Sequence, residues 1–135
     1  TGDSLFVGSV ARPDLQDGSA GAPELARHLF ETLTERLASL PDETIVAPGH
    51  FEDAAEIGED GTVSASLGEL RKQLPYFGMD RATFVERIAD DLPPQPANFE
   101  TIVAVNLGRD DADDETAFEL ELGPNNCAVG PVEAD

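Results

Sequence analysis

The stretch Thr-Gly-Asp-Ser-Leu-Phe-Val-Gly-Ser-Val-Ala-Arg-Pro-Asp-Leu, residues 1–15, is the part of the chain that decides the fold. It places Asp3 beside the short apolar run 4–10, and Arg12 and Asp14 follow this run. A short continuous apolar run flanked by turn residues is typical of a buried strand. We therefore expect a strand over 4–10 with a carboxylate at its start.

The leucine pattern after this stretch predicts a helix. Residues 11–22 contain turn-forming proline and glycine and are expected to be a loop. From Pro23 to about Ser39 leucine recurs at every fourth position, which is the spacing of one helix face. A second short apolar strand is expected over 44–47, and it ends at a Pro-Gly pair.

Two more helices are predicted after an acidic loop. Ser66 and Glu69 have the spacing of a capping box, and a helix start near Thr62 fits equally well. Asp80 is the expected N-cap of a helix that ends near Leu92, just before a proline-rich segment.

The remaining pattern completes an α/β arrangement, with helices packed on a sheet. The apolar run 102–105 is interpreted as a strand, and a weaker run follows around 118–122. We expect a domain over 1–109 and an acidic, weakly structured extension over 110–135.

The chain is strongly acidic, with 28 Asp and Glu, 8 Lys and Arg and a net charge of −20. Because salt screens such self-repulsion, this composition is typical of proteins from a salty cytoplasm, as in halophiles. The dense acidic run 110–115 offers the alternative of a basic partner. Nucleic-acid binding through a basic patch is excluded by the sign of the charge.

The chain shows no pattern of an exported or membrane-spanning protein. Its single cysteine, Cys127, cannot form an intrachain disulfide, which favours a reducing compartment. No apolar run approaches the roughly 20 residues that span a bilayer, and no signal-peptide pattern opens the chain. We expect a cytoplasmic protein with no membrane partner.

Asp3 and His50 are the candidate metal ligands. Each follows a glycine and lies at a junction between a predicted strand and a loop. Carboxylate and imidazole groups bind zinc, iron or manganese in mixed sites, and three protein ligands are usual for catalytic zinc. The alternatives are a solvated turn histidine and an ordinary strand-edge acid. His28, within the predicted helix, is interpreted as structural.

The run 1–15 followed by Leu-Pro-Asp-Glu-Thr-Ile-Val-Ala-Pro-Gly-His, residues 40–50, resembles the metallo-β-lactamase-fold enzymes. The pattern is most similar to persulfide dioxygenases and their rhodanese-linked relatives, and next to hydroxyacylglutathione hydrolases. It continues more loosely through 62–70, 84–99 and 102–106. The resemblance implies the C-terminal half of an αββα sandwich.

The resemblance also implies roles for Asp3 and His50. Asp3 matches the metal-binding aspartate, which bridges two metals in the hydrolases and completes a two-histidine, one-carboxylate iron site in the dioxygenases. His50 matches the last histidine of the motif, which binds a second metal in the hydrolases and usually not the iron of the dioxygenases. The implied cofactor is Fe²⁺, with two Zn²⁺ ions as the alternative.

Arg12 matches a cationic residue that lies near the substrate thiol in both families. There it could pair with a substrate carboxylate, or it could form a structural ion pair with Asp14. Ala11 departs from the pattern, because the family usually has glycine at that position.

The family's His-x-His-x-Asp-His motif is not present in this sequence, which contains 2 histidines in total. We therefore expect this chain to supply at most half of an active site. It would need the N-terminal half of the domain as its partner, and alone we expect it to be poorly soluble or to self-associate as a homo-oligomer. No catalytic residue is assigned.

Three function classes follow. The first is part of a non-haem iron dioxygenase that oxidises a thiol persulfide to sulfite. The second is part of a binuclear thioester hydrolase, and the third is an inactive fragment or acidic interaction module.

Overall fold

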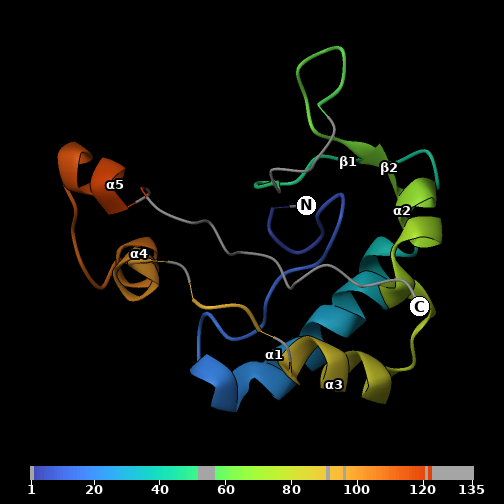
Figure 1. Cartoon of the computed structure of the whole chain (residues 1–135), viewed down its shortest axis with the longest axis horizontal. Helices are drawn as coiled ribbons and strands as arrows, with labels where there is room; N and C mark the ends of the chain where they lie inside the picture. Colours follow the sequence, from blue (N-terminus) through green and yellow to red (C-terminus); the bar gives the residue numbers. More distant parts are fainter. Residues whose placement is uncertain (1, 52–56, 91, 96, 121, 123–135) are drawn as a thin grey trace.

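The computed structural model describes residues 2–51, 57–90, 92–95, 97–120 and 122, and it has an α/β architecture (Figure 1). Predictions for the acidic segment 52–56, for Cys127 and for the rest of 123–135 lie outside the described residues. The elements, in chain order, are α1 (Gly18–Glu31), η1 (Thr32–Leu37), β1 (Ile45–Val46), β2 (Ala65–Ser66), α2 (Leu67–Gln73), η2 (Pro75–Gly78), α3 (Arg81–Asp90), α4 (Phe99–Asn106) and α5 (Asp114–Leu120).

The opening apolar run is buried, but it does not form the predicted strand. Leu5 and Val10 form an isolated antiparallel bridge, and the Phe6 N–H donates to the Ser9 carbonyl at 3.0 Å. The chain therefore reverses between Leu5 and Val10, where Gly8 interrupts the large side chains. The prediction of a strand over 4–10 is wrong for this reason, whereas the predicted burial of Leu5 and Phe6 is confirmed.

The predicted leucine-rich helix is present, and it begins earlier than expected. Helix α1 starts at Gly18, which has φ +65°, and Pro23 lies inside it. Pro23 removes one intrahelical hydrogen bond without ending the helix, so the expected loop over 11–22 is wrong from Gly18 onward. The helix continues into the π-helical segment η1, which ends at Leu37.

Both predicted caps at the following helices are confirmed. At the start of α2, the Glu69 N–H donates to the Ser66 hydroxyl and the Glu69 carboxylate accepts from the Ser66 N–H. The alternative start near Thr62 is wrong, because Ala65 and Ser66 form the short strand β2 and the helix begins at Leu67. At α3, Asp80 accepts from the N–H groups of Ala82 and Thr83.

The sheet is small. Strands β1 and β2 pair antiparallel, with Ile45 opposite Ser66 and Val46 opposite Ala65. Strand β1 lies within the predicted strand 44–47, whereas β2 was not predicted. The Leu67 N–H also donates to the Thr44 carbonyl at 2.8 Å, so the hairpin leads directly into α2.

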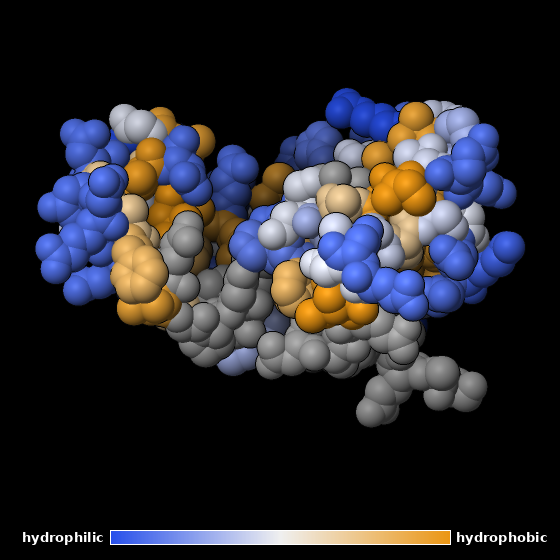
Figure 2. Space-filling model, turned by 90° about the horizontal axis from the view of Figure 1, so that it is seen from above, coloured by the Kyte–Doolittle hydropathy of each residue, from blue (hydrophilic) through white to orange (hydrophobic). Residues whose placement is uncertain are grey.

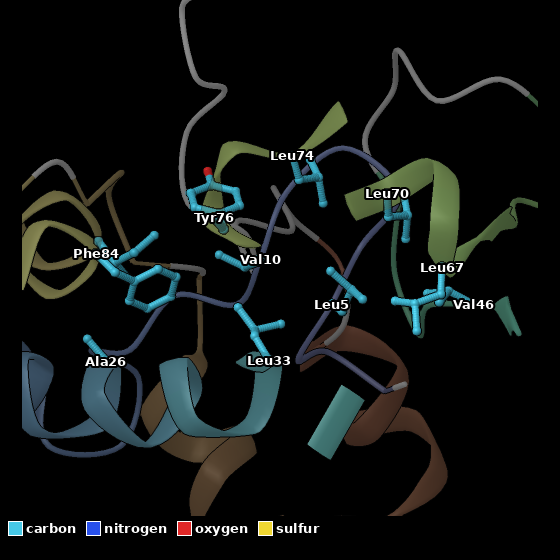
Figure 3. Packing of buried hydrophobic residues seen from close by; sticks show 11 residues of the cluster. Leu5, Val10, Ala26, Leu33, Val46, Leu67, Leu70, Leu74, Tyr76 and Phe84 are labelled. Atoms are coloured by element: carbon cyan, nitrogen blue, oxygen red, sulfur yellow. The ribbon is translucent and has the colours of Figure 1, made fainter. Parts of the chain in front are cut away.

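One apolar core joins these elements. Figure 3 shows Leu33 of η1, Phe84 of α3 and Leu70 of α2 converging on the opening loop. The Phe84 ring makes edge-on contacts with Phe30 and Tyr76, with centroids 5.4 and 6.0 Å apart. Such pairs add to the stability that area burial provides. The core therefore packs the opening loop, residues 2–15, against α1, α2 and α3.

Residues 102–105 form part of helix α4, so the predicted strand is wrong there. The chain leaves α4 through Gly108, at φ +66°, and the Arg109 N–H donates to the Ala104 carbonyl at 2.8 Å. This pattern is a Schellman C-cap, which stabilises a helix over the apolar run. The weaker run near 118 likewise lies in a helix, α5.

Helices α4 and α5 have no buried residues and stand apart from the core on the left of Figure 1. In the space-filling view, this part of the molecule has apolar side chains at its surface among hydrophilic ones (Figure 2). In the part of the chain described here, no helix combines the length and the apolar character needed to cross a bilayer.

Candidate metal centre

The structure brings Asp3 and His50 into direct contact. The His50 Nδ1 lies 2.7 Å from Asp3 Oδ1, and each side chain is 45% exposed. Since a carboxylate only accepts hydrogen bonds, the Nδ1–H of the ring donates to Asp3. Two residues 47 positions apart therefore form one polar site at the surface.

Backbone contacts bring the two motif segments together. Gly2 and Pro48 form a parallel bridge, and the Gly49 N–H donates to the Gly2 carbonyl at 3.0 Å. Asp3 and His50 are the next residues along each segment. The site is therefore located by main-chain hydrogen bonding, and the side chains meet as a consequence.

The structure explains why glycine occupies positions 2 and 49, directly before Asp3 and His50. Gly2 has φ +54°, a left-handed conformation that costs residues with a Cβ. At Gly49 an added Cβ would lie 2.9 Å from Asp3 Oδ1, which is closer than such atoms pack. The missing side chain of Gly49 is what lets the Asp3 carboxylate reach His50.

Gly49→Ala is expected to turn the Asp3 carboxylate away from His50, because rotating that side chain is the cheapest way to relieve the clash. Metal affinity should fall by about tenfold, as for changes around metal ligands, while the unfolding temperature changes little. Chelator competition and thermal unfolding measure the two effects.

The matched control is Gly78→Ala. At Gly78 an added Cβ meets nothing within 4 Å, so this variant should keep both properties. Equal metal affinity in the two variants would contradict the role given to Gly49.

The donor chemistry of this pair suits a metal ion, and the pair alone does not complete a site. A carboxylate oxygen and an imidazole nitrogen are ligands for iron and zinc. Among the described residues, no group of three or more His, Cys, Asp or Glu side chains could hold a metal. His28 lies exposed on α1, where its Nδ1 is 3.9 Å from Glu31 Oε2.

Arg12 is buried next to Asp14. The Nε–H donates to Asp14 Oδ1 at 2.7 Å and Nη2 donates to Oδ2 at 2.8 Å, which is a forked, bidentate pair. Nη1 also donates to the Pro94 carbonyl at 2.8 Å, and Nη2 donates to the Pro93 carbonyl at 2.6 Å. The ion pair that the sequence offered as an alternative for Arg12 is thus present.

The Arg12 contact governs the charge of Asp14. Burial by itself would raise the pKa of the Asp14 carboxyl, but the hydrogen bonds and positive charge of Arg12 outweigh it and lower the pKa below its ordinary value. The Gln95 amide adds a weak contact to Asp14 Oδ2 at 3.4 Å. Asp14 is therefore ionised at neutral pH, as its role in the pair requires.

Sequence reasoning missed the part played by the proline-rich segment. Pro93 and Pro94 were interpreted only as the end of a helix, yet their carbonyls are partners of Arg12. No local signal could reveal this, because the contacts join residues more than 80 positions apart.

A cavity of about 320 Å³ lies next to the proline-rich segment. Its lining residues are Leu15, Gln16, Gly18, Gln95, Phe99, Glu100 and Val103.

No protein-family model matches the chain. Among curated proteins, it is 42% identical over 50 residues to an uncharacterised protein of Mycobacterium leprae, covering 37% of this chain and 20% of that protein. It is 39% identical over 69 residues to an uncharacterised protein of Aquifex aeolicus, covering 51% of this chain and 29% of that protein. The chain spans less than a third of these relatives.

Solved structures share the fold. A metallo-β-lactamase from Staphylococcus aureus matches with a TM-score of 0.65 and 26% identity, over 84% of this chain and 32% of that chain. ETHE1 from Myxococcus xanthus matches with a TM-score of 0.63 and 31% identity, over 78% of this chain and 42% of that chain. The predicted α/β fold class and the similarity to metallo-β-lactamase-fold proteins are confirmed.

Proposed function

We propose that this chain contributes a metal ligand, Asp3, to an enzyme of the metallo-β-lactamase superfamily, and that this enzyme is a non-haem iron persulfide dioxygenase. The observation that carries the proposal is the contact between Asp3 and His50, at 2.7 Å. The resemblance of the opening motif to persulfide dioxygenases and the 31% identity to ETHE1 favour this branch of the superfamily.

In this proposal Asp3 and His50 have different tasks. The Asp3 carboxylate supplies an oxygen ligand, and the His50 ring holds that carboxylate in place through its Nδ1–H. A carboxylate with a fixed second partner presents its remaining lone pairs in one direction. Bound ferrous iron would supply the redox chemistry by which dioxygen oxidises the persulfide sulfur.

The remaining ligands would come from residues outside this sequence. In the dioxygenase, Asp3 supplies the one carboxylate of a two-histidine, one-carboxylate site, and both histidine ligands would come from elsewhere. Large apolar side chains of the described residues are also exposed: Leu40, Ile45, Phe51, Ile57, Leu107, Phe118 and Leu122. We propose that the other half of an αββα sandwich supplies the ligands and packs against part of this surface.

The test uses the full-length protein that contains this segment. Purified protein is analysed for iron and zinc, and oxygen uptake and sulfite release are followed with a low-molecular-weight thiol persulfide. Iron content together with persulfide-dependent oxygen uptake supports the proposal. Zinc without oxygen uptake would overturn the dioxygenase.

The second candidate is a binuclear thioester hydrolase, and the proximity of His50 to Asp3 favours it. There the two residues would be ligands of neighbouring metal ions, which lower the pKa of a bound water toward about 7. Localisation in the cytoplasm and adaptation to high salt stay predictions.

His50→Ala separates the two candidates. A hydrolase should lose at least about a hundredfold in rate, because a metal ligand is removed. A dioxygenase should lose about tenfold or less, because only the support of Asp3 is removed. The exposed His28→Ala is the matched control, and its activity with either substrate should equal that of the wild type.

A further inference from the structure

We infer that Arg12 is a positioning residue, which clamps the segment 93–95 to the loop that carries Asp3 and does not contact substrate. The inference rests on the proposed role of Asp3 as a ligand. It departs from the family resemblance, which implies a contact between this arginine and the substrate.

The Arg12 guanidinium is buried, and protein oxygens already accept its hydrogen bonds. Its Nε, Nη1 and Nη2 groups all donate to protein oxygens, and the Arg12 side chain is 1% exposed. A substrate carboxylate would have to displace Asp14, which matches the guanidinium fork with both oxygens. Removing one partner of a buried pair leaves an uncompensated charge, so such an exchange is strongly unfavourable.

The proline segment, residues 93–95, contacts Arg12 through the carbonyls of Pro93 and Pro94. A proline lacks an N–H, so Pro93 and Pro94 cannot donate to a neighbouring strand. Two contacts that tie this pair to the opening loop run through the proline carbonyls, which both accept from Arg12. Lysine could not replace these contacts, since it presents one compact ammonium rather than a planar fork.

Backbone hydrogen bonds connect the segment that carries Arg12 to the segment that carries Asp3. The Ala11 N–H, one residue before Arg12, donates to the Ser4 carbonyl at 3.4 Å, and the bridge between Leu5 and Val10 adjoins it. Ser4 is covalently next to Asp3. A shift of Arg12 is therefore passed across this narrow loop to the ligand carboxylate.

The experiment compares Arg12→Lys with the wild type in the full-length protein, with the exposed Arg27→Lys as control. Hydrogen exchange at the Phe6 and Ala11 amides should become at least about tenfold faster in Arg12→Lys. Affinity for Fe²⁺, measured by chelator competition, should fall by about 10–100-fold. The KM for the persulfide should stay within about twofold, because no substrate contact is lost.

A second variant, Asp14→Asn, keeps the guanidinium and removes the charge of its buried partner, which loosens the hold of Arg12 on residues 93–95. It should show the same faster exchange and weaker metal binding. If KM rises about tenfold in Arg12→Lys while exchange and metal affinity equal those of the wild type, Arg12 contacts the substrate and the inference is wrong. Unchanged exchange in both variants also overturns it.

The outcomes distinguish this inference from the proposed function. If the wild type takes up no oxygen, the dioxygenase proposal fails while the exchange and metal measurements still decide the role of Arg12. If the wild type is active and both variants keep wild-type exchange and metal affinity, only the inference about Arg12 fails.

Discussion

Replacing Asp3 by asparagine is expected to remove most of the metal and activity of the full-length protein while leaving its fold intact. Asparagine keeps the shape of the side chain and loses its charge. Losing about 3 kcal/mol of metal-dependent stabilisation of the transition state lowers the rate roughly a hundredfold. Metal analysis of the purified protein and steady-state kinetics measure the two losses.

Asp17→Asn is the matched control for Asp3→Asn. Asp17 is exposed at the start of α1, and its side chain makes no capping hydrogen bond there. This variant should keep the metal content and rate of the wild type. Normal metal content in Asp3→Asn would show that Asp3 is not a ligand, and the proposed function would then fail at its central residue.

Phe84→Ala is expected to lower the free energy of unfolding by about 3–5 kcal/mol. Phe84 is 0% exposed and lies between Phe30 of α1 and Tyr76 of η2. The change removes the ring and leaves a cavity where three elements meet, and both ring pairs are lost with it. Urea unfolding followed by circular dichroism measures the effect.

Phe118→Ala is the matched control for Phe84→Ala, because it removes the same side chain from an exposed position. The same side chain at position 118 is 68% exposed on α5, so its removal should change the free energy of unfolding by no more than about 0.5 kcal/mol. Similar losses of unfolding free energy in the two variants would mean that the buried Phe84 ring stabilises the fold no more than an exposed ring does.

Local signals in the sequence predicted several elements correctly. The capping box of Ser66 and Glu69 and the cap at Asp80 act over three residues, and both are formed. The leucine spacing predicted the helix that became α1 and η1. These features follow from neighbours in the chain, so they require no knowledge of the rest of the fold.

The two wrong strands show where local reading failed. The runs 4–10 and 102–105 are apolar and short, and such runs are compatible with strand, helix or a folded loop. The turn at Phe6 to Ser9 decided the first case, and the C-cap at Gly108 decided the second. In each case backbone hydrogen bonding outweighed side-chain preference.

For the candidate site, the sequence determined which residues belong to it and what chemistry they offer. The motif around Asp3 and the Pro-Gly-His ending at His50 were identifiable without coordinates. The pairing of Arg12 with Asp14 was one of two alternatives that the sequence left open, and the structure decided it. The sequence also showed that Asp3 and His50 each follow a glycine, whereas the left-handed turn at Gly2 and the close approach at Gly49 were visible only in the structure.

Only the tertiary structure decided which of these residues meet. It joined Asp3 to His50 across 47 positions and Arg12 to Pro94 across 82. Such contacts depend on how α1, α2 and α3 pack around the opening loop, and no spacing along the chain encodes that packing. Residue chemistry was therefore set by the sequence, whereas the distances between distant groups were set by burial of the common core.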